Sequence, residues 1–97
     1  ATKGAIIAFT RSLARETAHE HLRVNAVAPA DVLTPLTERQ LSPHVPHAEQ
    51  LRQMADIYPM GRIGRPEEAA AVIVFLASSA ASWITGSIYT VDGGLLA

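Results

Sequence analysis

The sequence contains no cysteine and only one lysine. Without cysteine the chain forms neither a disulfide nor a thiolate metal site, and its composition fits a reducing, cytoplasmic location. Its longest strongly apolar run, Ala69–Ala77, has nine residues, whereas about 20 are needed to cross a bilayer. The formal net charge is −1, so the chain has no excess of positive charge that attracts nucleic acid or anionic lipid. These absences exclude a disulfide scaffold and predict a protein that binds neither nucleic acid nor membrane.

The chain is 97 residues long and 48% hydrophobic, which is enough apolar material for one small domain or a part of one. Apolar spacing and breaker residues predict a helix over 2–20, a strand over 22–29, a long connection over 30–47, a short amphipathic helix near 51–58, a helix over 66–77 and a strand over 88–91. A helix that runs directly into a short apolar strand is typical of an α/β unit in a parallel sheet. Two strands are too few for a complete doubly wound sheet.

The helix over 66–77 has a strong start signal. Pro66 stands at its first position, and Glu67 and Glu68 follow beside the positive end of the helix dipole. The rest of this helix is apolar on nearly every face, and the first helix has two apolar faces. Both helices are therefore expected to be covered by other protein surfaces.

Four stretches in a fixed order carry a resemblance to a known family: ATKGAIIAFTRSLA, RVNAVAPADVLTPL, GRIGRPEEAAAVIVFLAS and ITGSIYTVDGG. Together they resemble the C-terminal part of the short-chain dehydrogenase/reductases and leave only about residues 38–56 unmatched. The resemblance implies an α/β fold, the C-terminal portion of a Rossmann-type doubly wound parallel sheet. Residues 1–97 are then the C-terminal segment of a single NAD(P)-binding domain, with a substrate lid at about 34–58.

Lys3, the single lysine, stands in the first turn of the first expected helix, where the helix dipole disfavours a cation by roughly 0.3–1 kcal/mol. By resemblance it is the family's catalytic lysine, which follows a tyrosine by four residues. Residues four apart share a helix face, and an ammonium beside a phenol lowers the phenol's pKa from about 10. The resemblance also implies that Lys3 binds the cofactor's ribose hydroxyls. The alternative is a solvated surface lysine.

The stretch PADVLTP, which begins at Pro29, resembles the segment of the family that faces the nicotinamide ring. The resemblance assigns cofactor contacts to Pro29, Ala30, Val32 and Thr34. By this resemblance, the Val32 backbone contacts the nicotinamide carboxamide, and the Thr34 hydroxyl contacts the carboxamide or the phosphates. Ala30 replaces the usual glycine and adds a methyl group where the backbone approaches the ring. The alternatives are ordinary turn chemistry for Thr34 and plain packing for Val32.

The resemblance implies an oxidoreductase that interconverts an alcohol and a carbonyl by hydride transfer, with NAD or NADP as cofactor. It implies a small-molecule alcohol or carbonyl substrate and a homo-oligomer, either a dimer or a tetramer. Met54, Tyr58 and Met60 are expected either in the core or, if the lid forms, at the substrate pocket. The chain starts without Met and has no glycine-rich phosphate turn after a strand. We therefore expect a fragment or truncated member of the family that is inactive by itself.

Three other interpretations remain at this point. His44 and His47 are three residues apart, but zinc requires three or four convergent ligands, so no metal site is expected. The GRIG stretch at 61–64 resembles the loop with which K-homology domains clamp single-stranded RNA, although the near-neutral charge speaks against this. The apolar helix over 66–77 and the terminal strand also suit a non-catalytic piece that serves only assembly.

Overall fold

The computed structural model describes residues 2–97, and Ala1 lies outside the described part. Its elements in chain order are the helices and strands α1 (Thr2–Thr17), η1 (Ala18–Glu20, a 3₁₀ turn), β1 (Ala26–Pro29), α2 (Pro35–Arg39), α3 (His47–Ala55), α4 (Pro66–Ala77), η2 (Ser79–Ala81, a 3₁₀ turn) and β2 (Ile88–Val91). The predicted mixture of helix and strand is confirmed. Within residues 2–97 no helix has the length and apolar character that a membrane crossing requires.

The chain divides into two compact units. Unit 1 contains the residues up to Ala28 together with Ala71–Tyr89, and unit 2 contains Pro29–Ala70 and Thr90–Ala97. Strands β1 and β2 pair in a two-stranded sheet. Ala26 N–H donates to Ser87 O (2.9 Å) and Ala30 N–H to Val91 O (3.1 Å). Both partners advance by four residues in the same direction, so the strands run parallel.

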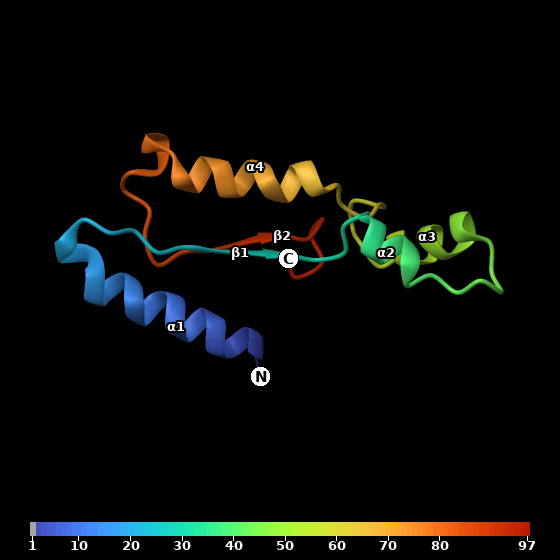
Figure 1. Cartoon of the computed structure of the whole chain (residues 1–97), viewed down its shortest axis with the longest axis horizontal. Helices are drawn as coiled ribbons and strands as arrows, with labels where there is room; N and C mark the ends of the chain where they lie inside the picture. The colour runs from blue at the N-terminus through green and yellow to red at the C-terminus, as the bar shows by residue number, and fades with distance from the viewer. Residues whose placement is uncertain (1) are drawn as a thin grey trace. The chain divides into compact units, whose positions relative to one another are not determined.

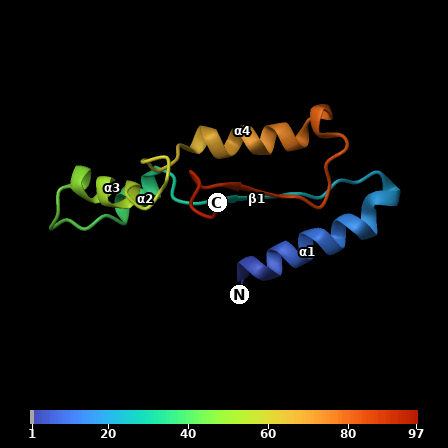
Figure 2. The same ribbon diagram turned by 180° about the vertical axis from the view of Figure 1, so that it is seen from behind.

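In unit 1 the strands lie between two helices, with α1 on one side and residues 71–77 of α4 on the other (Figures 1 and 2). Thr10 and Ala14 are the buried residues of α1, and they share one face because they are four residues apart. Gly86 lies against this face, since a Cβ on it would stand 3.4 Å from the Ala14 Cβ. The close approach of helix and loop depends on these two small residues.

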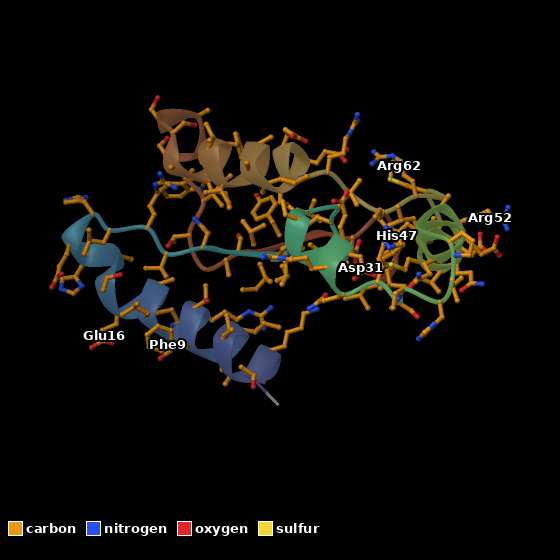
Figure 3. All side chains as sticks on the ribbon, turned by 45° about the vertical axis from the view of Figure 1, so that its right-hand side comes forward. Phe9, Glu16, Asp31, His47, Arg52 and Arg62 are labelled. Carbon is orange, nitrogen blue, oxygen red and sulfur yellow. The ribbon has the colours of Figure 1, made fainter. Side chains whose placement is uncertain are left out.

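The opposite face of α1 is open. Figure 3 shows Phe9 and Glu16 on the side of α1 that points away from the strands. Phe9 is 66% exposed. Ile6, four residues before Thr10, borders the buried face and is still 52% exposed. The second apolar face that the sequence predicts therefore exists, and no described residue covers it.

Strand β1 is shorter than the predicted strand over 22–29. Val24 forms its hydrogen bonds outside the ladder, since its N–H donates to Thr85 Oγ1 (3.0 Å) and its carbonyl accepts from Gly86 N–H (2.7 Å). The Asn25 side-chain amide donates to the Ile84 carbonyl, and its oxygen accepts from Ser87 N–H, both at 3.0 Å. Side-chain contacts thus replace strand pairing before Ala26.

Arg23 holds the end of α4 within unit 1. Its guanidinium donates to the carbonyl oxygens of Leu76 (2.8 Å), Ser78 (3.3 Å) and Ile84 (3.4 Å). The last carbonyls of a helix have no partner within the helix, and a cation there is favoured by the helix dipole. Arg23 therefore both caps α4 and ties it to the segment that leads into β2.

Unit 2 contains a helix that the sequence analysis missed. The connection expected over 30–47 includes α2, and Thr34 caps its first turn by accepting from Thr37 N–H (3.2 Å). Pro35 occupies the first helical position, where its missing N–H costs nothing. The expectation of an irregular connection was wrong because a five-residue helix is too short to show periodicity, although its capping signals are present.

The turn between α2 and α3 is fixed by one side chain. The Gln50 amide accepts from Ser42 N–H and donates to the carbonyls of Ser42 and Val45, each at 2.8 Å. Helix α3 ends at Ala55, earlier than the expected helix near 51–58. Tyr58 thus follows the helix instead of belonging to it, and its N–H donates to Ala55 O (3.1 Å).

Candidate functional site

The segment Pro29–Thr34 begins where β1 ends. Pro29 closes the strand, and Ala30 N–H makes the last strand contact, to Val91 at the end of β2. In parallel α/β sheets, ligands bind just outside the carboxyl ends of the strands. Four of the five predicted site residues, namely Pro29, Ala30, Val32 and Thr34, therefore lie together in unit 2, where this rule places a ligand.

Gly64 fixes the middle of the segment. Its N–H donates to Asp31 O and its carbonyl accepts from Leu33 N–H, both at 2.9 Å, which makes a parallel bridge opposite Val32. A Cβ on Gly64 would stand 3.2 Å from Val32 Cγ1 and 3.5 Å from Asp31 O, so glycine permits this approach. The Val32 N–H has no acceptor among residues 2–97. It is a free donor within an otherwise bonded segment.

Thr34 acts in this structure as the cap of α2. Its hydroxyl oxygen lies 3.1 Å from the Thr37 hydroxyl oxygen and accepts from Thr37 N–H. The Thr37 hydroxyl donates to Val32 O (2.7 Å). The structure thus contains the turn chemistry that was the alternative for Thr34, while its predicted contact with a cofactor stays a prediction.

Tyr58 and Asp31 form a pair that the sequence analysis did not identify. The Tyr58 hydroxyl donates to Asp31 Oδ2 (2.7 Å) and accepts from Asp31 N–H (3.0 Å). Tyr58 is 6% exposed, and burial, followed by the hydrogen bond to the Asp31 carboxylate, raises its pKa. The phenol is therefore neutral at physiological pH and acts as a hydrogen-bonding group. The two residues are 27 apart, so no local pattern could have found the pair.

A cavity of about 290 Å³ in unit 2 is lined by Asp31, Val32 and Tyr58 and by residues that follow β2, among them Asp92 and Gly93. Of the predicted site residues only Val32 lines it. The cavity thus borders the carboxyl ends of both strands.

Lys3 belongs to unit 1, whereas the four other predicted site residues belong to unit 2. It lies in the first turn of α1, and its side chain is exposed. Within residues 2–97, no hydrogen-bond or ion-pair partner is found for its ammonium group. Both its predicted catalytic role and the alternative of a surface lysine agree with this placement.

The histidines and the GRIG turn gave rise to two of the other interpretations. Within the described range, no group of three or more histidine or acidic side chains lies close enough to hold a metal ion. In the GRIG turn, the Arg62 guanidinium is bound to Glu68 (2.7 and 2.8 Å), and Gly64 makes the bridge to Val32. This turn therefore connects the segment after β1 with the start of α4.

Comparison with known proteins identifies the family. A family profile described as enoyl-(acyl carrier protein) reductase matches residues 1–96. The chain is 47% identical over 96 residues to a glucose and ribitol dehydrogenase homolog of Oryza sativa subsp. japonica, with 99% of this chain and 30% of the relative covered. It is 43% identical over 96 residues to a 3-oxoacyl-[acyl-carrier-protein] reductase of Thermotoga maritima, with 99% and 37% covered.

A solved structure of a short chain dehydrogenase family protein from Francisella tularensis superposes with a TM-score of 0.90 at 33% identity, over 97% of this chain and 41% of that one. The chain thus spans about a third of the length of the curated relatives described here. The predicted Rossmann-type α/β fold is confirmed. The chain belongs to the short-chain dehydrogenase/reductase family.

Proposed function

We propose that this chain contributes the segment that holds the nicotinamide ring in an oxidoreductase that interconverts an alcohol and a carbonyl, with NAD or NADP as cofactor. Membership of the family supports an oxidoreductase function. The observation that carries the proposal is the free Val32 N–H, which lies in a bonded segment at the carboxyl end of β1. A carboxamide oxygen is an acceptor that such a donor can bind.

Each predicted residue has a part in this proposal. Val32 N–H binds the carboxamide, and the backbone at Pro29 and Ala30 lies beside the ring. The Thr34 hydroxyl keeps its place at the cap of α2, with its proton directed to the Thr37 hydroxyl oxygen, and offers its free acceptor position to the carboxamide NH₂ group; a contact with the phosphates requires its proton to turn toward them. The chemistry expected of a bound nicotinamide is hydride transfer to or from the substrate carbon.

Lys3 is proposed as the catalytic lysine. Its ammonium group binds the ribose hydroxyls and lowers the pKa of a tyrosine one helical turn before it, which then exchanges a proton with the substrate oxygen. The exposed position of Lys3 in the first turn of α1 leaves the ammonium free for these contacts.

The substrate is proposed to be a small alcohol or carbonyl compound, bound under the segment 34–58 as a lid. We also propose a cytoplasmic homo-oligomer, either a dimer or a tetramer. The exposed apolar side chains of α1 and α4, such as Phe9 (66%) and Val74 (68%), support association.

Cofactor binding tests the proposal. The test protein is a fusion in which this chain replaces the matching part of the Thermotoga maritima reductase, of which it covers 37%. The folded fusion is expected to bind NADH or NADPH, as measured by the enhancement of nicotinamide fluorescence. A folded fusion that binds neither cofactor contradicts the proposed function.

Two variants of the fusion test the donor itself. Val32→Pro removes the N–H and is expected to weaken binding about tenfold, since one hydrogen bond is lost and its partner is left unpaired. Val32→Ala keeps the N–H and serves as the matched control, with binding close to wild type. Equal affinities of the two variants, each shown to be folded by circular dichroism, rule out the role assigned to Val32.

A further inference from the structure

Asp31 lies three residues before the predicted lid at about 34–58, and Tyr58 is the last residue of that lid. Asp31 precedes α2, Tyr58 follows α3, and the segment between them leaves and returns at this pair. The pair is joined by two hydrogen bonds, one to the Asp31 carboxylate (2.7 Å) and one from the Asp31 N–H (3.0 Å). The Tyr58 hydroxyl thus joins the chain before the lid to the last residue of the lid, using its donor and one of its acceptor positions.

The Tyr58 ring has little freedom to move. It is 6% exposed, and a Cβ on Gly93, whose φ is +57°, would stand 3.5 Å from Tyr58 Cβ and 3.6 Å from its Cδ1. Met60 N–H donates to Gly93 O (3.1 Å), which holds the two segments together on either side of the ring. Burial against fixed backbone makes the position of the hydroxyl well defined.

The orientation of the backbone around Asp31 follows from its partners. Asp31 N–H points to the Tyr58 hydroxyl, and Asp31 O accepts from Gly64 N–H (2.9 Å). No cis peptide bond is present among residues 2–97, and in a trans peptide the C=O and the next N–H point in opposite directions. The bond to Gly64 therefore turns Val32 N–H away from Gly64, and the bond to Tyr58 fixes the preceding peptide, which carries Ala30 O.

We propose that Tyr58 is a positioning residue: through Asp31 it sets the Ala30–Asp31 peptide plane, next to the Asp31–Val32 plane that Gly64 sets, and thereby helps to hold Val32 N–H ready for the nicotinamide carboxamide. The inference rests on the proposed function of that segment. Tyr58 acts here through Asp31 and takes no part in proton transfer.

The test uses the fusion protein described above and the single variant Tyr58→Phe, which keeps the ring and removes the hydroxyl. The matched control is Tyr89→Phe, because no hydrogen-bond partner is found for the Tyr89 hydroxyl in the described part of the chain. Tyr58→Phe is expected to raise the Kd for NADH or NADPH about tenfold, because two hydrogen bonds that pre-order the segment are lost. Tyr89→Phe is expected to leave the Kd unchanged.

Substitution of Asp31 distinguishes positioning from general destabilisation. Asp31→Asn retains a side-chain oxygen that accepts from the phenol, so its cofactor affinity is expected to stay within about twofold of wild type. Asp31→Ala removes that acceptor and is expected to weaken binding. The double variant Asp31→Ala, Tyr58→Phe is expected to weaken it no further than Tyr58→Phe alone, because both changes remove the same contact.

Amide hydrogen exchange supplies a readout that needs no cofactor. In the fusion without cofactor, Tyr58→Phe is expected to speed exchange at Leu33 N–H and Gly64 N–H about tenfold. Unchanged exchange at these amides, or an unchanged cofactor Kd in Tyr58→Phe, overturns the positioning role while the proposed function stands. A folded wild-type fusion that binds no cofactor overturns the proposed function and the positioning role together.

Discussion

Arg62 and Glu68 form a two-point ion pair in unit 2, with Arg62 Nη1 donating to Oε1 (2.8 Å) and Nη2 donating to Oε2 (2.7 Å). Glu68 Oε1 also accepts from Arg65 N–H (2.9 Å). Glu68 stands at the third position of α4, so this contact is half of a capping box. One carboxylate therefore both caps α4 and fixes the turn that carries Gly64 to Val32.

This pair predicts acid sensitivity. The hydrogen bonds from Arg62 and from the Arg65 backbone lower the pKa of Glu68 from its ordinary 4.5 to about 2. A lowered pKa in the folded state means that the stabilisation is complete above about 4.5 and is lost as the pH falls toward about 2. In the fusion protein, Glu68→Gln is expected to lower the melting temperature at neutral pH and to flatten its dependence on pH between these two values.

Glu67→Gln is the matched control for this prediction. Glu67 occupies the neighbouring position in α4, and no hydrogen bond or ion pair of its carboxylate is found within residues 2–97. This variant should keep the pH dependence of the wild type. If the two variants have the same melting profile from pH 7 downward, the helix dipole alone explains the effect of these glutamates and the ion pair contributes nothing measurable.

The start of α4 also shows what the sequence predicts well. Pro66, Glu67 and Glu68 are local signals, and the helix begins at Pro66 as predicted. The cap of α2 is equally local, yet that helix was missed because a five-residue element has no periodicity. Local chemistry thus predicts where a helix starts better than whether a short one forms.

The parts of the site that depend on distant contacts could not be predicted. Four of the predicted residues do lie together, at the last position of β1 and just after it, because they are neighbours in the chain. The partners that fix their backbone, Tyr58 and Gly64, come from later segments, and only tertiary packing brings them to Asp31. Strand β1 begins at Ala26, later than predicted, for the same reason. The hydrogen bonds of Val24 and Asn25 go to residues about 60 positions away in the chain.

Lys3 gives the most direct catalytic prediction. In the fusion protein, Lys3→Met is expected to lower kcat by about 10²-fold or more, because it removes the charge that favours the ionised phenol. The fold should be unaffected, since the Lys3 side chain is exposed. Arg11→Met, which removes another exposed cation from α1, is the control. Equal kcat values for both variants, measured under saturating cofactor and substrate, favour the surface-lysine interpretation.

The 97-residue chain by itself is expected to show no dehydrogenase activity. Its six glycines do not form a G-x-G-x-x-G turn, which holds the dinucleotide phosphates in Rossmann folds. Steady-state oxidation of NADPH by the purified chain, compared with a heat-inactivated sample over a panel of small carbonyl compounds, provides the measurement. Turnover above the inactivated control contradicts the prediction.

The chain by itself is also expected to associate. In α4 only Leu76 is buried, whereas Ile73 and Val74 are 55% and 68% exposed. Phe9 on α1 is 66% exposed. Large apolar side chains exposed on both helices favour contacts with other protein surfaces or aggregation. Sedimentation velocity at micromolar concentration should therefore show oligomers or aggregates of the wild-type chain.

One substitution on α1 and one on α4 test whether the exposed apolar side chains cause the association. Val74→Lys and Phe9→Lys place a charge on an exposed apolar position and should shift the sedimentation profile toward smaller species, since a charge resists burial in an apolar contact. Thr90→Lys, at an exposed position of β2, is the control for added charge alone. If the control shifts the profile as strongly, general charge repulsion is the cause. If the wild-type chain is a monodisperse monomer with slow amide exchange in α4, the exposed apolar faces need no partner and the association prediction fails.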